Sequence, residues 1–425
     1  MYPIRRRRLT VLAAVAGLLA TAACSGGSPG SGSGGDLAGA GTASSPAVSA
    51  SAGVSAPGPS TPGPSNATGP AATSSSGGLK AGTGFTVVAT GDVLLHPPLW
   101  AQARRDAVHT GKGTMDFAPM LAGVKPYVSS ADLAICHLET PLAPAGGPFT
   151  GYPNFSGPPQ ISTALASTGY DVCSTASNHT LDQGAAGITR TLNSLDTASI
   201  AHAGSARSPA ESRRITLLTA NGVRVAFLSY AFGFNGHSYP GGQRWRANLI
   251  DPGQILADAR RARADGAQAV VLALHWGTEY SQVPSAQQRA LAPKLARSGL
   301  VDLIISHHAH VVEPIKRIGR TWVVYGLGNL LADHSTPGAA NSEGLLVRFS
   351  FTRTSSGRYT ATRAEYLPLL MTKTAPLRVL DVPGTLRSAD YGSTTRSRLL
   401  AALTRTTRVV RSLGATKQGL TPISP

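Results

Sequence analysis

Residues 301–312 read Val-Asp-Leu-Ile-Ile-Ser-His-His-Ala-His-Val-Val, an apolar run that ends in three histidines. The apolar part is typical of a buried β-strand, so the histidines come where that strand would end. In an extended backbone, side chains two positions apart point the same way. His308 and His310 are therefore predicted to reach one metal ion, with His307 pointing elsewhere. The alternative is a surface histidine run without a ligand role.

The same layout recurs along the chain, because polar residues follow the apolar runs 85–89, 133–136, 172–174 and 269–274. These residues are Asp92, Glu139, Asn178 with His179, and His275. Ligands in open α/β sheets bind beyond the carboxyl ends of the strands. Carboxylate, amide and imidazole groups are ligands for divalent metals. The order predicts a phosphoesterase-type site for one or two ions of Mn, Fe, Zn or Mg, in which Glu139 can bridge two cations.

The remaining site predictions concern proton transfer and substrate. His179 is the predicted general acid, and Asp182 is placed to orient its ring or to cap a helix over 184–195. His96, Glu279 and Asn329 are the predicted substrate contacts. Each of these residues alone also fits an ordinary structural role in a turn or on the surface. Only the ordered set favours a catalytic site.

Strand-like and helical patterns alternate, which predicts an α/β domain with mixed sheets and outer helices. Two hairpins are expected, one across Asn221-Gly222 and one across Gly319-Arg320. The predicted helices span 117–128, 159–168, 184–195, 251–264, 286–297 and 395–413. Cys136 and Cys173 end two strands, and the sequence leaves open whether they form a disulfide or stay free thiols.

The first 82 residues differ in composition from the rest. Residues 1–23 combine four arginines with a short apolar stretch and resemble a lipoprotein export signal, with lipid attached at Cys24. An ordinary secretory signal is the alternative. Residues 24–82 are rich in Ser, Gly, Pro and Ala and are expected to be a disordered tether. The expected product is exported and lipid-anchored on the outer face of the cytoplasmic membrane.

The net charge of the 425-residue chain is +17 at pH 7. This charge favours an anionic environment, such as wall polymers, acidic lipids or polyanionic substrates. The arginines are dispersed, except in the predicted basic helix near the C-terminus, and no basic stripe with interleaved aromatics occurs. A nucleic-acid partner is therefore not expected.

Taken together, these segments resemble the bacterial capsule synthesis protein CapA family, the poly-γ-glutamate biosynthesis proteins. The matching segments are Thr90-Gly91-Asp92-Val93, Leu138-Glu139-Thr140-Pro141, Asn178-His179 with Asp182-Gln183-Gly184, His275-Trp276-Gly277-Thr278-Glu279-Tyr280, His308-Ala309-His310-Val311 and Leu327-Gly328-Asn329. The chain departs from the family pattern at His137, where Asn is usual, at Ser306, where Gly is usual, and at Ala309, where Pro is usual. It also lacks the Asp-x-His signature of ordinary metallophosphatases, since Asp92 and His96 are four apart.

The resemblance implies a four-layer α/β/β/α sandwich of the metallo-dependent phosphatase type over 83–380, followed by a basic helix and tail over 381–425. It implies a role in making capsule, poly-γ-glutamate or another anionic cell-surface polymer, through a metal-dependent hydrolase-type site. Expected partners are the polymer or its precursor, the membrane through Cys24, and membrane-embedded polymer synthase subunits. The alternative is a non-catalytic surface lipoprotein that binds polymer or partner proteins for export or anchoring.

Overall fold

The computed structural model describes residues 84–334 and 338–424, which belong to one compact unit spanning 75–425. The expected signal, Cys24 and tether lie outside the described residues. Within the described part, no helix has the length and apolar character needed to cross a membrane.

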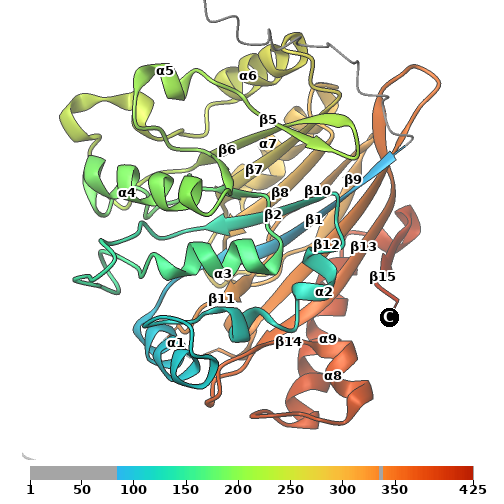
Figure 1. Cartoon of the computed structure of the whole chain (residues 1–425). Helices are drawn as coiled ribbons and strands as arrows, with labels where there is room; N and C mark the ends of the chain where they lie inside the picture. The colour runs from blue at the N-terminus through green and yellow to red at the C-terminus, as the bar shows by residue number, and fades with distance from the viewer. Residues whose placement is uncertain (1–83, 335–337, 425) are drawn as a thin grey trace, which may run out of the picture. The chain divides into compact units, whose positions relative to one another are not determined.

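A nine-stranded mixed sheet combines the first four strands of the chain with β11 to β15 from its C-terminal part. Its main path runs β14-β13-β12-β1-β2-β3-β4, with β11 paired to β1 and β15 paired to β13 (Figure 1). The first four strands of the chain are mutually parallel, whereas β12, β13 and β14 extend the sheet in antiparallel fashion. The strands are β1 (Gly84–Val93), β2 (Leu133–Leu138), β3 (Val172–Ser174), β4 (Ala201–Ala203), β11 (Asn329–Leu331), β12 (Glu343–Arg353), β13 (Tyr359–Met371), β14 (Val379–Asp381) and β15 (Leu420–Pro422).

A six-stranded sheet, in the order β5-β6-β7-β8-β10-β9, packs against the first. Its central strands are parallel, and an antiparallel strand closes each edge. The strands are β5 (Thr216–Ala220), β6 (Val223–Ala231), β7 (Ala269–Trp276), β8 (Leu303–His308), β9 (Ile315–Ile318) and β10 (Thr321–Val324). Both expected hairpins are confirmed, and Asn221 and Gly222 adopt the positive φ angles of 45° and 76° that a tight hairpin turn requires.

Alternation of side chains along the strands produces the layers. In β1, Val87 and Ala89 face the core between the sheets, whereas Val88 and Val93 face the helices. The helices α1 (Pro97–Thr110), α3 (Gln160–Thr168) and α4 (Gly184–Thr197) cover the outer face of the nine-stranded sheet. The helices α6 (Pro252–Ala264) and α7 (Ala286–Arg297) cover the outer face of the other sheet. The predicted four-layer α/β/β/α sandwich is therefore confirmed.

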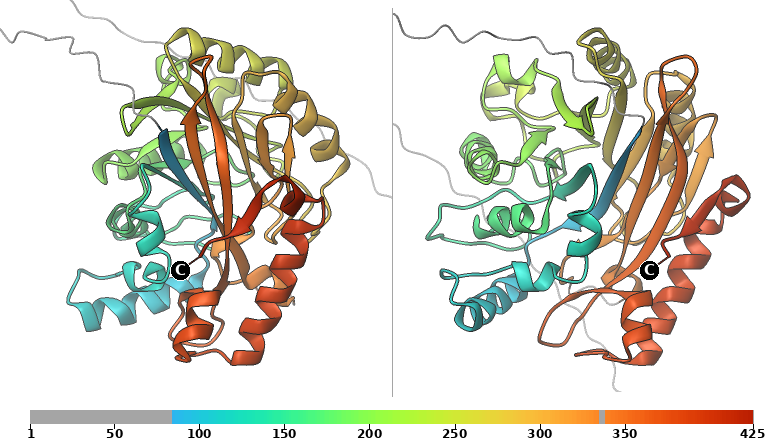
Figure 2. Two further views of the ribbon diagram at one scale, coloured as in Figure 1. Left: turned by 90° about the vertical axis from the view of Figure 1, so that its right-hand side faces the viewer. Right: turned by 45° about the vertical axis from the view of Figure 1, so that its right-hand side comes forward.

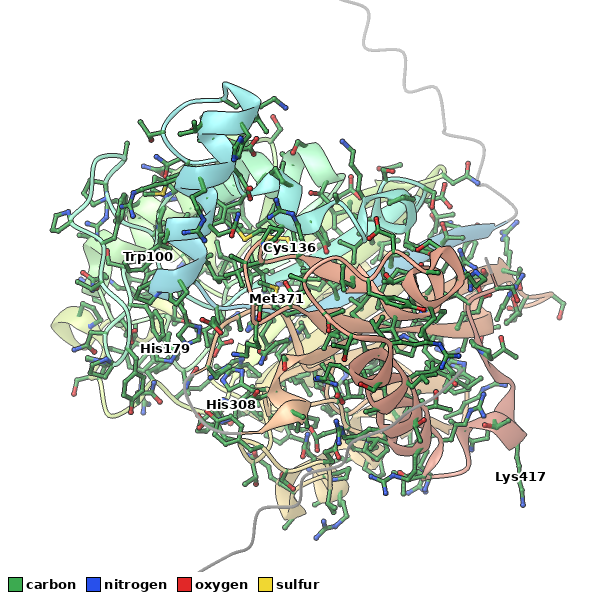
Figure 3. All side chains as sticks on the ribbon, turned by 90° about the horizontal axis from the view of Figure 1, so that it is seen from below. Trp100, Cys136, His179, His308, Met371 and Lys417 are labelled. Atoms are coloured by element: carbon green, nitrogen blue, oxygen red, sulfur yellow. A yellow bond between two sulfur atoms is a disulfide. The ribbon has the colours of Figure 1, made fainter. Side chains whose placement is uncertain are left out.

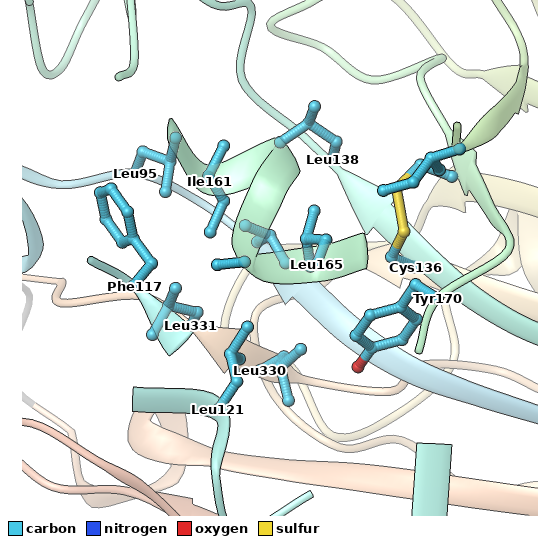
Figure 4. Packing of buried hydrophobic residues seen from close by; sticks show 14 of the residues in the cluster. Leu95, Phe117, Leu121, Cys136, Leu138, Ile161, Leu165, Tyr170, Leu330 and Leu331 are labelled. Atoms are coloured by element: carbon cyan, nitrogen blue, oxygen red, sulfur yellow. A yellow bond between two sulfur atoms is a disulfide. The ribbon is translucent and has the colours of Figure 1, made fainter. Parts of the chain in front are cut away.

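Figure 4 shows part of the helix-side core, where Ile161 and Leu165 of α3 lie near Leu330 and Leu331 of β11. In the same cluster, Cys136 and Cys173 face each other across the parallel strands β2 and β3 and form a disulfide. The covalent link joins the two strands that lead to Glu139 and Asn178. Of the two alternatives that the sequence left open, the structure therefore shows the disulfide.

The C-terminal segment packs on β12 and β13 through α8 (Val382–Ser388) and α9 (Arg396–Arg411), which lie side by side (Figure 2). The buried carboxylate of Glu343 accepts hydrogen bonds from Arg398 at 2.6 Å and from Arg405 at 2.7 and 2.8 Å. Two arginines of α9 thus neutralise one buried acid at the start of β12, so part of the helix's basic character serves packing.

Two expected helices differ from the structure. The predicted helix over 117–128 is wrong as a single element, because it splits into a 3-10 turn, η1 (Ala118–Leu121), and a short α2 (Lys125–Val128). Between them Gly123 approaches the backbone so closely that a Cβ would lie 2.3 Å from the carbonyl oxygen of Val379. The helix α1 was not among the predicted helices, although Pro97 and Pro98 at its start suit the first turn of a helix.

A buried acid gives this fold a testable pH dependence. Glu313 is fully buried, one of its oxygens accepts a hydrogen bond from Gln288, and burial raises its pKa from 4.5 to about 8. Between these values the unfolded chain releases a proton that the folded chain retains, so stability falls as pH rises, by at most about 1.4 kcal/mol per pH unit. Glu313→Gln should therefore be more stable than the wild type at pH 8, with a smaller difference at pH 5, in urea unfolding at both pH values.

The matched control is Glu365→Gln, which removes another buried carboxylate. Glu365 accepts two hydrogen bonds from Arg348, so this variant should be less stable than the wild type at both pH values. Equal stability of the Glu313→Gln variant and the wild type at pH 8 would contradict the prediction.

Candidate metal centre

The predicted ligands meet where the carboxyl ends of strands from both sheets converge. Asp92 and Glu139 come from the ends of β1 and β2, and His275 and His308 come from the ends of β7 and β8. All four side chains are buried. Figure 3 labels His308 and His179, which lie on the same side of the molecule. Two sheets thus supply one site, as the strand-end pattern predicts.

The first donor group contains Asp92, Glu139 and His310. Nδ1 of His310 lies 3.3 Å from an Asp92 oxygen, and Nε2 of the same ring lies 3.6 Å from Oε1 of Glu139. Asp92 also accepts hydrogen bonds from Nδ1 of His307 at 2.8 Å and from the backbone N–H of His308 at 3.2 Å. The Asp92 carboxylate is therefore held in one orientation by β8.

The second donor group surrounds His275. Its Nε2 lies 2.9 Å from Oδ1 of Asn178 and 3.9 Å from Oε1 of Glu139, and its ring centroid is 4.8 Å from that of His308. Asn178 donates from Nδ2 to Asn235, which directs its Oδ1 towards His275. Glu139 therefore lies between the two donor groups and has one oxygen close to an imidazole of each.

The Glu139 carboxylate supplies the test of whether a cation fits. Both its oxygens are buried, and neither has a hydrogen-bond partner among the described residues. Burial raises the pKa of Glu139 well above its ordinary value, with Asp92 and Glu279 adding to the effect and His310 opposing it. A buried carboxylate without partners is costly unless a positive charge lies beside it. The donor set, rich in imidazole and carboxylate, therefore fits a divalent metal.

Burial and neighbouring charged groups also set the pKa values of Asp92 and of the three histidines among the donors. Burial raises the pKa of Asp92, but hydrogen bonds from His307 and His310 outweigh it and hold that pKa well below its ordinary value. Burial lowers the pKa of His275 far below 6.5 and that of His308 to about 3. Burial would also lower the pKa of His310, but Glu139 and Asp92 outweigh it and raise the pKa to about 9. His275 and His308 are thus neutral at pH 7, as imidazole ligands must be, whereas His310 would have to release its proton to a bound metal.

A buried relay stands behind His275. Its Nδ1 lies 2.9 Å from Nε2 of His137, whose Nδ1 lies 2.8 Å from Oγ of Ser174. If Ser174 donates to the carbonyl oxygen of Cys136, 3.3 Å away, His137 donates to Ser174 and His275 donates to His137. Nε2 of His275 then carries a lone pair that faces Asn178 and Glu139. The opposite set of hydrogen bonds also gives each ring one proton. In that set Ser174 donates to His137, His137 donates to His275, and Nε2 of His275 donates to Oδ1 of Asn178.

Near this centre, His179 and Asp182 form the predicted dyad. Nδ1 of His179 lies 2.7 Å from an Asp182 oxygen that also accepts the backbone N–H of Phe155 at 2.8 Å. The Phe155 ring stands edge-on to His179, with ring centroids 4.7 Å apart. These contacts fix the imidazole and leave Nε2 as the nitrogen that can transfer a proton. The predicted alternative, in which Asp182 caps the helix α4, is not seen, because the N-cap residue is Gln183 and no side chain forms a cap hydrogen bond there.

The three residues assigned to substrate lie in different settings. Glu279 is exposed, and its carboxylate lies within 4.8 Å of ligand atoms of His308 and His310. His96 is half-buried, accepts the backbone N–H of Asp333, and has its pKa lowered to about 4 by burial. Asn329 is buried and bonds His310 and the carbonyl oxygen of Asn341, so it orients His310. Direct substrate contact by these residues stays a prediction.

The histidine segment differs in geometry from the extended run expected. His308 and His310 both have positive φ angles, 94° and 54°, so strand alternation does not bring them together. A turn does so instead, because their ligand atoms still lie within 4.8 Å of each other and of Glu279. His307 is not a member of that group, because its ring bonds Asp92 and stacks on His137 at 4.1 Å.

Four residues at the centre had no predicted role. His137 and His307 form its inner wall, while the ring centroids of Phe232 and His334 lie 4.5 Å from that of His308 and 4.4 Å from that of His310. The sequence marked His137 only as a departure from the family pattern. Phe232 and His334 follow β6 and β11, so the strand-end rule could have identified them.

Comparison with known proteins identifies the family of the chain. The family model described as "Bacterial capsule synthesis protein PGA_cap" matches residues 86–334, which include every candidate metal ligand. The chain belongs to this family. It is 30% identical over 173 residues to the capsule biosynthesis protein CapA of Bacillus anthracis, covering 40% of this chain and 42% of that protein. It is 30% identical over 205 residues to the PGA biosynthesis protein CapA of Bacillus subtilis, covering 47% of this chain and 51% of that protein.

A probable polyglutamine synthesis accessory protein of Mycobacterium tuberculosis is 27% identical over 229 residues, covering 50% of this chain and 59% of that protein. The matched region therefore spans about half the length of these curated relatives. Among solved structures, a putative 5'-nucleotidase from Staphylococcus aureus overlaps with a TM-score of 0.41 at 14% identity, covering 68% of this chain and 55% of that one. A calcineurin-like phosphoesterase from Bacillus subtilis overlaps with a TM-score of 0.37 at 14% identity, covering 77% of this chain and 97% of that one.

The relay predicts that His137 controls metal affinity without touching the metal. His137→Leu removes the hydrogen-bond partner of His275, so metal affinity measured by calorimetry should fall about 10- to 100-fold. His137→Gln, which keeps a polar partner, should recover part of the loss. His109→Ala changes an exposed histidine on α1 and should leave the affinity unchanged. Wild-type affinity in a folded His137→Leu protein would contradict this role.

Proposed function

We propose that this protein is an exported, metal-dependent hydrolase that acts on an anionic cell-surface polymer or its precursor, in capsule or poly-γ-glutamate biosynthesis. The observation that carries the proposal is the buried carboxylate of Glu139, which has no hydrogen-bond partner in the described part of the chain and lies near the imidazoles of both His275 and His310. The family and the names of its relatives support the polymer context. Lipid attachment at Cys24 to the outer face of the membrane, and contact with polymer synthase subunits, belong to the same proposal.

In this proposal Asp92, Glu139 and His310 would hold one divalent ion. Glu139, Asn178, His275 and His308 would hold a second, and each ion could be Mn, Fe, Zn or Mg. Bound ions would polarise the oxygen of the scissile bond and provide a water acidic enough to attack at neutral pH. Asn329 holds His310 and His137 holds His275, so the ligands are positioned before substrate arrives. Glu279 and His96 are the proposed contacts for substrate at the rim.

The protein side of the reaction is one proton transfer. His179 in its protonated form gives its Nε2 proton to the oxygen or nitrogen that leaves, while Asp182 stabilises the ring through Nδ1. Phe155 packs against the ring and limits its movement. Both an ester of phosphate and a γ-glutamyl amide have a leaving atom that needs such a proton. The site therefore suits hydrolysis of either bond.

The metal assignment is tested by Glu139→Gln, which keeps the size of the side chain but removes its charge. Metal content after dialysis, measured by elemental analysis, should fall at least about tenfold relative to the wild type, because the shared ligand is lost. His308→Ala should act in the same direction. Glu313→Gln, which changes an equally buried acid outside the donor groups, is the control and should retain its metal. Full metal retention in the Glu139 and His308 variants would refute the centre.

The catalytic assignment has a separate test. His179→Ala should lower kcat on phosphodiester or γ-glutamyl substrates by about 10²- to 10⁴-fold with unchanged metal content, because the ring donates a proton and binds no metal. Asp182→Asn should lower kcat by a smaller factor than His179→Ala. A metal-loaded wild type that turns over neither substrate class would overturn the hydrolase proposal and support the alternative, a polymer-binding surface lipoprotein.

A further inference from the structure

Basic side chains gather at the end of the fold that lies opposite the metal centre. The parallel strands β6, β7, β8 and β10 all begin at this end, whereas β7 and β8 carry His275 and His308 near their other ends. The tip of the β12-β13 hairpin belongs to the same end, because Arg358 donates to the carbonyl oxygen of Gly299, between α7 and β8. Both sheets therefore contribute to this basic end.

Three cations of the basic end share one acid. Asp302, buried just before β8, accepts hydrogen bonds from Arg263 and, at 3.0 Å, from Arg320. Arg358 lies 3.9 Å from the oxygen that Arg320 contacts. Burial lowers the pKa of Arg358, and the charges of Arg320 and Arg263 add to that effect. A positive excess remains, because one carboxylate cannot neutralise three guanidinium groups.

Further cations around this group are exposed. Lys294 and Arg297 lie in the last turn of α7, Arg224 lies at the start of β6, and Arg353 ends β12. The ion pairs at the basic end involve only the three arginines near Asp302, so these four exposed cations have no acidic partner among the described residues. Their charges are free to attract an anionic partner.

The acidic residues at this end do not cancel the excess. Asp265, at the C-cap of α6, is exposed beside Arg224, which donates to its carbonyl oxygen at 3.4 Å. Asp132 and Asp171 precede β2 and β3, which lie on the other side of β1 from β12. Their carboxylates accept backbone N–H groups, that of Thr86 at 2.8 Å and that of Ala134 at 2.7 Å. The exposed cations on α7, β6 and β12 therefore dominate the charge of their own side.

The basic end is polar as well as charged. The hairpin tip after Arg353 reads Thr354-Ser355-Ser356-Gly357. Within 84–334 and 338–424, none of the large exposed apolar side chains belongs to this tip, to the β9-β10 turn or to the last turns of α6 and α7. A partner that binds here is therefore held by charge, without insertion of apolar side chains.

The point where the chain enters the fold favours one partner, a membrane surface. Gly84 begins β1 at the basic end, pairs with Thr352 and accepts a hydrogen bond from Asn221 at 2.8 Å (Figure 1). Residues 1–83, with the proposed lipid site Cys24, come directly before it in the sequence. The metal centre lies at the far end of the six-residue strand β8, about 20 Å away at 3.3 Å per residue. A lipid-linked tether thus joins the fold on its basic side.

We infer that this basic end is a docking surface for an acidic phospholipid membrane, with the metal centre turned away from the bilayer. The inference rests on the membrane anchoring in the proposed function and deepens it, because it assigns the face of the fold that meets the lipid. Lys294, Arg297, Arg353 and Arg224 contact lipid phosphates, to which arginine and lysine are attracted at an acidic bilayer. The contact weakens as salt rises, since exposed charges are screened.

The test is co-sedimentation of the chain from residue 25 onward, which contains the whole compact unit and has neither export signal nor lipid. The vesicles are equal parts phosphatidylglycerol and phosphatidylcholine, or phosphatidylcholine alone. The triple variant Lys294→Gln, Arg297→Gln, Arg353→Gln should bind acidic vesicles at least about tenfold more weakly, since each cation near such a bilayer contributes about fivefold.

The matched control is the triple variant Arg104→Gln, Lys112→Gln, Arg396→Gln. It removes the same charge from exposed positions on α1, after α1 and on α9, and should weaken binding less than about threefold. All six side chains are exposed and lack ion pairs with described residues, so both variants should unfold in urea at the midpoint of the parent chain.

Equal loss of binding in both triple variants would overturn the inference, because net charge alone would then explain the affinity. Equal binding to neutral and acidic vesicles would also overturn it. Displacement by inorganic phosphate at constant ionic strength would assign the cations to a discrete phosphate ligand in place of a membrane surface. Metal content and turnover of a soluble phosphodiester should match in all three proteins. Failure of the hydrolase proposal would appear in the turnover of the parent chain and would leave vesicle binding intact.

Discussion

The carboxylate of Glu139 is held at the end of β2, in the space where the two sheets meet. It is buried, and no residue within 84–334 or 338–424 forms a hydrogen bond with it. Such a group raises the energy of the folded chain unless a cation accompanies it. The side chains around Glu139 are the ligand types that would hold such a cation. Imidazoles from β7 and from the turn after β8 approach the same oxygen from two sides, and the second carboxylate, Asp92, completes the set.

A rigid scaffold makes this arrangement possible. The parallel centres of both sheets deliver their carboxyl ends to one region, while the disulfide between Cys136 and Cys173 ties together the strands that lead to Glu139 and Asn178. Behind the ligands, His137 and His307 stack and bond His275 and Asp92. Two imidazoles that bind no metal in this arrangement thus link the two halves of the centre. Ligand geometry is set by this inner wall as much as by the strands.

Much of the site follows from residue order. A polar residue after an apolar strand lies at a predictable edge of the sheet. The sequence alone therefore groups Asp92, Glu139, Asn178, His275 and the histidine segment. The same reasoning missed α1, although the two prolines at its start are compatible with a helix N-terminus. It also failed for the path of His308 and His310, because left-handed backbone conformations depend on tertiary packing more than on local propensity.

The sequence by itself determined the α/β class, the two hairpins and the identity of the candidate ligands, because strand period and strand ends are local properties of the chain. Only the tertiary structure decided which side chains share a contact. The disulfide, the Ser174–His137–His275 relay and the role of Asn329 behind His310 all depend on contacts between separate segments of the chain. Contacts of this kind depend on sheet packing and register, which no local pattern encodes.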